Sequence, residues 1–151
     1  MKEFTSINDV LDFAIENEQG AVDFYKKLAE EARNEEMKSI FEQFAREEIG
    51  HKARLIKIRE QGNFEVSKEV IADLRVSDYI ANVDPYPGMS YQDALRVAMS
   101  REKSAFKLYS KLSAGAQNDE MKALFQSLAQ EESKHKLRFE LEYDDFVMRE
   151  N

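Results

Sequence analysis

Both histidines of the chain lie in the same short pattern, in which a glutamate is followed three residues later by a histidine. The pattern stands as Glu48 with His51 and again as Glu132 with His135. Residues three apart lie on one face of a helix, so each pair can present a carboxylate and an imidazole to the same point. Oxygen and nitrogen donors of these kinds bind iron, manganese and zinc. The pattern therefore indicates a metal site, although one copy alone is common on solvated helices.

The two pairs are copies within an internal repeat. Residues 14–55 align without a gap on residues 98–139, at a constant offset of 84, and 18 of the 42 aligned positions are identical. The matched positions include Glu18 with Glu102. Chance does not produce this similarity over such a length, so the chain contains two copies of one structural unit.

Each copy is expected to be a pair of antiparallel helices. Apolar residues recur at spacings of three and four, which places them on one face of a helix. Residues that favour helix N-termini precede the four helical stretches: Thr5 or Ser6, Asn34, Ser90 and Asn118. Only a few residues separate the two stretches of each copy, which favours antiparallel neighbours.

The fold class that follows is all-α, a four-helix bundle made of two hairpins at about 6–61 and 90–148. One domain over residues 1–151 is expected from the chain length. Gly62 is expected to end the second helix, and residues 62–89 are long enough to cross the whole bundle. This connection contains both prolines of the chain, and a short helix fits around residues 67–74.

Six polar side chains interrupt the apolar stripes at positions where a bundle should be buried. They are Glu18, Glu48, His51, Glu102, Glu132 and His135. In each hairpin the two glutamates are about fifteen residues from the turn, so all six should form one layer about 22 Å above it. Burying four carboxylates together is costly unless cations compensate them. Two divalent ions carry four positive charges, which predicts a site for two metals; a metal-free bundle that pairs these groups with one another is the alternative.

Composition and charge exclude several classes of partner. The formal net charge is −8, so nucleic acid and anionic membranes would be repelled, and no apolar run is long enough for a signal peptide or a membrane span. Cysteine is absent, so the sequence holds no disulfide, thiolate metal site or iron–sulfur site. We expect a cytoplasmic protein.

At these residues the sequence resembles the ferritin-like superfamily, and within it the rubrerythrin-type di-iron domain, over nearly the whole chain. The resemblance implies two iron ions as cofactors, with manganese or zinc as other metals that the same ligands bind. It implies that Glu18 and Glu102 are terminal ligands, that Glu48 and Glu132 bridge, and that the two histidines supply terminal nitrogens. The family also places a tyrosine seven residues after the first glutamate of each copy, here Tyr25 and Tyr109. These hydroxyls are expected to hold ligating carboxylates in place. Glu47 and Glu131 precede the buried glutamates but point off the stripe, so they are expected to be solvated, with a role in metal entry as the alternative.

Two departures from the rubrerythrin pattern limit what the resemblance implies. A rubredoxin domain needs four cysteines, so electrons would come from a separate donor such as a rubredoxin-like protein. Typical rubrerythrins also carry an extra glutamate at the place of Ala105, which weakens an inference to peroxide specificity. We expect an oxidoreductase that reduces hydrogen peroxide or dioxygen, with an iron-handling protein of ferroxidase type as the alternative, and the resemblance suggests a homodimer.

Overall fold

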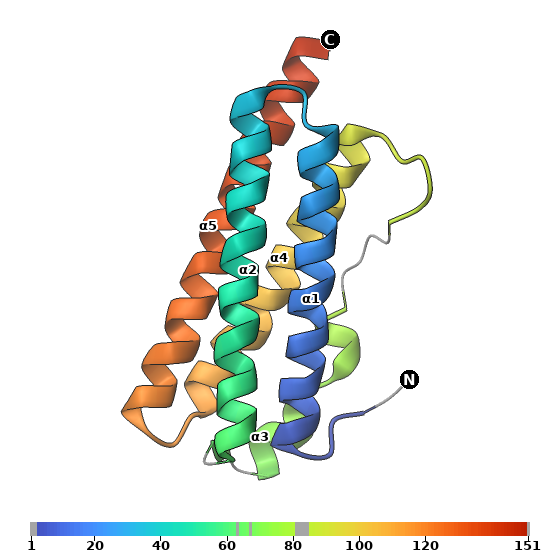
Figure 1. Ribbon diagram of the computed structural model, residues 1–151. Helices are drawn as coiled ribbons and strands as arrows, with labels where there is room; N and C mark the ends of the chain where they lie inside the picture. Colours follow the sequence, from blue (N-terminus) through green and yellow to red (C-terminus); the bar gives the residue numbers. More distant parts are fainter. Residues whose placement is uncertain (1–2, 63, 67, 81–84, 151) are drawn as a thin grey trace.

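Four long helices form the molecule, which we describe from a computed structural model covering residues 3–62, 64–66, 68–80 and 85–150 (Figure 1). The long helices are α1 (Ile7–Glu31), α2 (Glu35–Gln61), α4 (Tyr91–Gly115) and α5 (Asp119–Glu150). The all-α bundle of two antiparallel hairpins is confirmed, because α1 packs on α2, α4 packs on α5, and the two helices of each pair run in opposite directions (Figure 1). Within the described ranges, none of the helices is sufficiently long and apolar to pass through a bilayer.

The connection between the hairpins runs along the bundle from one end to the other. Figure 1 shows α2 ending at the lower end of the bundle and α4 starting at the upper end. On the way the chain forms α3 (Lys68–Asp73) and a 3₁₀ turn, η1 (Val76–Asp78). The expected short helix is therefore present, with Ser67 outside the described residues. The connection also buries Phe64, Leu74 and Tyr79, so it covers the core as well as linking the hairpins.

The helix ends follow the expected local chemistry. The side chains of Ser6, Asn34 and Ser90 each accept a hydrogen bond from the backbone three residues on, at 3.2, 2.8 and 3.1 Å. Asn118 does the same for the N–H of Met121 at 2.8 Å. Gly62 ends α2 with φ of 66°, a left-handed conformation that suits glycine. These residues therefore satisfy backbone groups that a helix end leaves open.

The core consists of two apolar clusters, one on each side of a buried polar layer. The first cluster includes Leu11, Leu55, Leu112 and Phe125. The second includes Leu28, Phe41, Phe44, Leu95 and Phe139. Among the described residues seven polar or charged side chains are buried; six of them are the ones expected in the layer, and the seventh is Glu142. Apolar packing on both sides of the layer thus holds its side chains at one height in the bundle.

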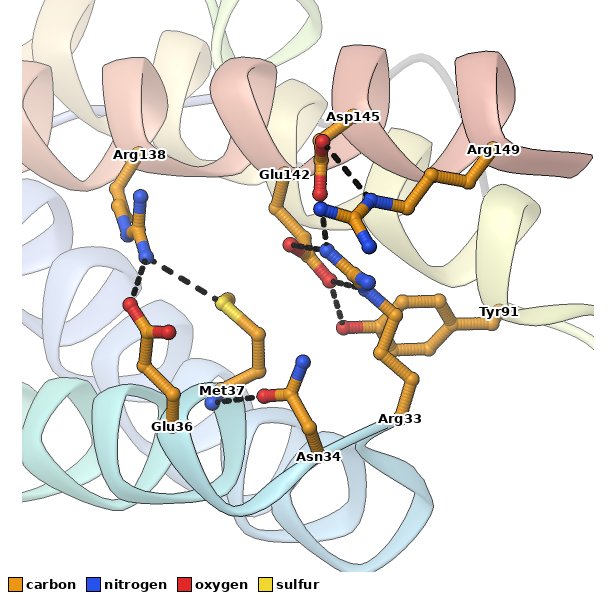
Figure 2. A network of polar contacts seen from close by, with 9 residues as sticks. All are labelled: Arg33, Asn34, Glu36, Met37, Tyr91, Arg138, Glu142, Asp145 and Arg149. Atoms are coloured by element: carbon orange, nitrogen blue, oxygen red, sulfur yellow. Dashed lines mark hydrogen bonds and ion pairs between the residues drawn. The ribbon is translucent and has the colours of Figure 1, made fainter.

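A polar network fixes the turn of the first hairpin to α5 and α4 (Figure 2). Glu142 is 3% exposed, and it accepts hydrogen bonds from Arg33 Nε at 2.8 Å and Arg33 Nη2 at 3.0 Å. The Tyr91 hydroxyl donates to the same carboxylate at 2.8 Å. Arg33 also contacts Asp145, which pairs with Arg149. Because a buried carboxylate needs a cation or strong donors, this network explains how Glu142 is tolerated.

Removing the arginine of this network should destabilise the fold. Arg33→Ala leaves the buried Glu142 with the Tyr91 hydroxyl as its remaining side-chain donor among the described residues. We expect a loss of about 1–3 kcal/mol in the free energy of unfolding, measured by urea denaturation of metal-free protein. Arg149→Ala, which removes an exposed contact to Asp145, is the control and should stay within about 0.5 kcal/mol. Equal effects of the two substitutions would show that Glu142 does not depend on Arg33.

Candidate metal centre

All six polar residues expected in the layer meet in the interior of the bundle. Helix α1 supplies Glu18, α2 supplies Glu48 and His51, α4 supplies Glu102, and α5 supplies Glu132 and His135. Each of the six is at most 2% exposed. Residues 84 apart occupy equivalent places in the two hairpins, so the layer has the pseudo-two-fold arrangement that the repeat indicates.

The ligand atoms of this layer fall into two overlapping groups. One atom from each of Glu18, Glu48, His51 and Glu132 lies within 4.8 Å of the others. The same holds for Glu48, Glu102, Glu132 and His135. Glu48 and Glu132 belong to both groups, which is the position expected of carboxylates that bridge two ions. The arrangement is a candidate di-metal site with one histidine and one terminal glutamate on each side.

The hydrogen bonding of the layer fits a bound metal. Each of the six residues has one buried oxygen or nitrogen without a hydrogen-bond partner, and in both histidines this atom is Nδ1. His51 Nδ1 lies 2.8 Å from an oxygen of Glu132, and His135 Nδ1 lies 3.0 Å from an oxygen of Glu48, yet neither contact has hydrogen-bond geometry. Buried polar atoms normally find partners, so six convergent atoms without one indicate a place for cations.

The electrostatics of the side chains alone lead to the same conclusion. Burial raises the pKa of Glu48 well above its usual range, and repulsion by Glu132 and Glu102 raises it further. Burial and the charge of Glu102 act likewise on the pKa of Glu132. Burial lowers the pKa of His135, but the carboxylates of Glu102 and Glu48 outweigh it and bring the pKa to about 11. Without cations the layer therefore retains protons, which metal ions would displace.

Two buried tyrosines connect the hairpins at the layer. The Tyr25 hydroxyl, on α1, donates to Glu102 on α4, and the Tyr109 hydroxyl, on α4, donates to Glu18 on α1. Both tyrosines are fully buried, and burial raises the pKa of each well above its usual range, followed by the charge of the carboxylate it contacts. Each tyrosine therefore stays protonated and holds a carboxylate of the opposite hairpin, Glu102 or Glu18, in position.

Glu47 and Glu131 have a role that sequence reasoning missed. The expectation that they are merely solvated is wrong, because Glu131 lies 2.6 Å from His51 Nε2 and Glu47 lies 2.8 Å from His135 Nε2. Their side chains are 33% and 35% exposed. A position one residue before the buried glutamate lies at the edge of the stripe, where a long side chain reaches the neighbouring helix. These carboxylates orient each imidazole so that Nδ1 faces the layer.

Neutralising one of these outer carboxylates should weaken metal binding without removing a ligand. We expect Glu47→Gln and Glu131→Gln each to lower metal affinity about 10–100-fold, since the imidazole loses a partner that orients it and raises its basicity. Affinity is measured by competition with a chromogenic chelator. Glu42→Gln, an exposed position on α2, serves as the matched control. Affinities that match the control would contradict this role.

A cavity of about 170 Å³ lies beside the layer, between α1 and α4. Its lining includes the four glutamates of the layer together with Asn17, Tyr79, Arg101 and Ala105. Ala105, which stands where the rubrerythrin pattern has a further glutamate, brings no fifth carboxylate to this cavity. The cavity gives a small molecule access to the carboxylate layer.

Comparison with known proteins places this geometry in a family. The sequence model of the family described as Rubrerythrin matches residues 9–143. A hypothetical protein from Pyrococcus furiosus is 30% identical, with a TM-score of 0.74 over 92% of this chain and 89% of that chain. A protein from Thermotoga maritima, described as a candidate ferritin-like diiron-carboxylate protein, is 21% identical, with a TM-score of 0.76 over 95% of this chain and 98% of that chain. None of the curated proteins compared is similar enough to count as a match.

Proposed function

The chain belongs to the rubrerythrin family, and on that premise we propose that it is a non-haem di-iron oxidoreductase that reduces hydrogen peroxide or dioxygen. The observation that carries the proposal is the pair of overlapping ligand groups, which share Glu48 and Glu132. Four carboxylates balance two ferrous ions in charge and favour the ferric state after oxidation. The two iron ions, when bound, supply the two electrons that the oxidant takes up.

The side chains have distinct tasks in this proposal. Glu18 and His51 would hold one ion, Glu102 and His135 the other, and Glu48 and Glu132 both. The buried hydroxyls of Tyr25 and Tyr109 keep the terminal carboxylates from turning away when the charge of the ions changes. Apolar clusters on both sides of the layer exclude bulk water, so electrostatic interactions inside it are strong.

The electrons return from outside the site. Reduction of one hydrogen peroxide to two waters consumes two electrons and two protons, so each turnover requires a reductant. We propose a separate rubredoxin-like protein as the donor, since the chain contains no cysteine that could form an iron–thiolate centre. A cytoplasmic location and a homodimer are part of the same proposal.

Repeated turnover separates this function from iron handling. Ferrous protein is mixed with hydrogen peroxide in a stopped-flow instrument, and consumption is then followed with excess reduced rubredoxin. The proposal predicts that peroxide disappears well beyond one equivalent per site. A single oxidation per loaded site, with iron that stays ferric in the presence of the donor, would instead favour a ferroxidase-like iron-handling protein. Glu48→Ala, which removes a shared ligand, gives the background rate.

A further inference from the structure

Arg101 brings a positive charge to the cavity beside the layer, and within the described part of the chain no carboxylate pairs with it. Arg101 lies on α4 immediately before Glu102, and it lines the cavity together with the four carboxylates. Its Nε atom is buried and has no hydrogen-bond partner. Among the described residues, no salt bridge to Arg101 is formed, whereas six other arginines pair with a carboxylate: Arg33, Arg54, Arg59, Arg96, Arg138 and Arg149. Arg46 and Arg75 form none either within these residues, but neither of them lines the cavity. A partly buried guanidinium with an unsatisfied donor is available to an anion.

The position of the guanidinium is set by its contacts with α1. The Arg101 Cζ atom lies 5.5 Å from the centroid of the Phe24 ring, within the range of a cation–π contact. A Cβ atom added at Gly20 would lie only 3.1 Å from Arg101 Nη1, so the absent side chain of Gly20 leaves room for the guanidinium. These contacts hold the Arg101 guanidinium between α1 and α4, and they leave its buried Nε–H without an acceptor among the described residues.

The charge is specific to one copy of the repeat. The position equivalent to Arg101, 84 residues earlier, is Asn17, and Asn17 also lines the cavity. Gly20 likewise corresponds to Ser104. The six candidate ligands are the same in both copies, but the cavity lining is not. Arg101 is therefore not needed to complete the duplicated ligand set, and its presence calls for a separate explanation.

We infer that this cavity binds a small anion, held by the Arg101 guanidinium beside the two metal ions. The inference rests on the proposed function and deepens it. Two ferric ions carry six positive charges against four carboxylates, so the oxidised layer retains two positive charges, and Arg101 adds a third. A cavity of about 170 Å³ holds only a few non-hydrogen atoms, and Ala105 brings no competing carboxylate. The planar fork of arginine suits an anion with two or more acceptor atoms.

Azide titration of the oxidised, iron-loaded protein tests the inference. Azide is a small anion whose binding to ferric iron is followed by visible absorption. We expect Arg101→Gln to bind azide at least tenfold more weakly than the unaltered protein at equal iron content. Lys103→Gln, an exposed position on α4 with the same change in charge, is the control and should bind azide within twofold of the unaltered protein. Unchanged azide affinity in iron-loaded Arg101→Gln would overturn the inference.

Two further measurements keep the test decisive. Arg101→Lys retains the positive charge, so it can be tested even if Arg101→Gln loads iron poorly. We expect Arg101→Lys to bind azide several-fold more weakly than the unaltered protein. Unchanged azide affinity in Arg101→Lys would overturn the role of the guanidinium. Nitric oxide is a neutral probe for the ferrous protein, and its affinity should be the same in Arg101→Gln and the unaltered protein. Equal weakening of azide and nitric oxide would mean that Arg101 shapes the cavity instead of binding charge, which also overturns the inference.

Failure of this inference is distinguishable from failure of the proposed function. Azide binding needs loaded iron but no electron donor and no turnover. If the unaltered protein consumes peroxide repeatedly but Arg101→Gln binds azide as tightly as the unaltered protein, the proposed function stands and the anion site is refuted. If the protein shows no turnover but its azide affinity depends on Arg101, the anion site stands and the proposed function is refuted.

Discussion

Glu48→Ala is expected to lose both metal ions, whereas His135→Ala is expected to lose one. Glu48 contributes to both overlapping ligand groups, but His135 belongs to one of them. Removing a shared carboxylate also takes one negative charge from each ion's surroundings. We expect fewer than about 0.3 metal ions per chain for Glu48→Ala and about one for His135→Ala. Both ions need the shared carboxylate of Glu48, whereas the ligand group of Glu18 and His51 does not include His135. Elemental analysis after loading and desalting measures the difference.

Loss of the ligand must be separated from loss of the fold. Burial and neighbouring carboxylates disfavour the charged form of Glu48, so its replacement should not weaken the metal-free bundle. Metal-free Glu48→Ala should therefore unfold at a temperature no lower than the unaltered metal-free protein. Glu42→Ala, on the exposed face of α2, should retain both ions. Two ions per chain in Glu48→Ala would contradict the assignment of Glu48 as a shared ligand.

Metal loading at pH 7 should release protons, and metal affinity should rise with pH. The pKa values of Glu48 and Glu132 are raised by burial first and then by neighbouring carboxylates. Burial lowers the pKa of His51, but Glu18 and Glu131 outweigh it, so the pKa is raised; that of His135 reaches about 11. A group with a raised pKa holds its proton to a higher pH than usual, and it must lose that proton to become a ligand. Loading of two ions should thus release up to about four protons.

A weakly buffered solution with a pH indicator reports this release directly. Zinc is a suitable probe ion because it does not change oxidation state during the titration. The sign is fixed by the direction of the shifts, so the apparent affinity should increase from pH 6 to pH 8, after correction for the chelator's own protonation. Binding without proton release, or affinity that falls over this range, would show that the carboxylates and imidazoles are not the ligands.

The duplicated pattern explains why the layer could be predicted from the sequence. A constant offset of 84 residues gives two hairpins, and hairpin symmetry about the turns sets Glu18 level with Glu48 and Glu102 level with Glu132. The structure brings these residues together with both histidines. The capping residues at the helix N-termini could be predicted equally well, because a side-chain cap depends on the backbone only three residues away. Features that depend on periodicity within one helix, or on local capping, can thus be predicted from the sequence.

Contacts between the hairpins could not be read in the same way. Tyr25 and Tyr109 were expected to hold ligands, but the structure adds that each donates to the glutamate of the other hairpin. The position of Glu47 and Glu131 off the buried stripe predicts solvated side chains, yet each reaches a histidine on the other hairpin. Such pairs depend on the rotation of one helix against its neighbour, which the spacing of apolar residues leaves undetermined.

Residues that follow no repeat were missed for a related reason. Glu142 is a buried carboxylate outside the layer, and only the position of the Arg33 turn against α5 shows what satisfies it. From the sequence alone, Arg101 is one of many charged residues on a helix. Only the structure shows that it lines the cavity and lies beside Gly20. A useful signal was nevertheless present, since Asn17 and Arg101 differ between otherwise similar copies.

The metal content per chain shows whether the buried layer binds two ions. Protein purified without chelator, then loaded anaerobically with ferrous iron and desalted, is measured by elemental analysis against protein concentration from amino-acid analysis. The buried layer of four glutamates and two histidines predicts two ions per chain, together with near-ultraviolet absorption after oxidation by air. Fewer than about one ion per chain under saturating iron, in protein with intact helical content, would contradict the account.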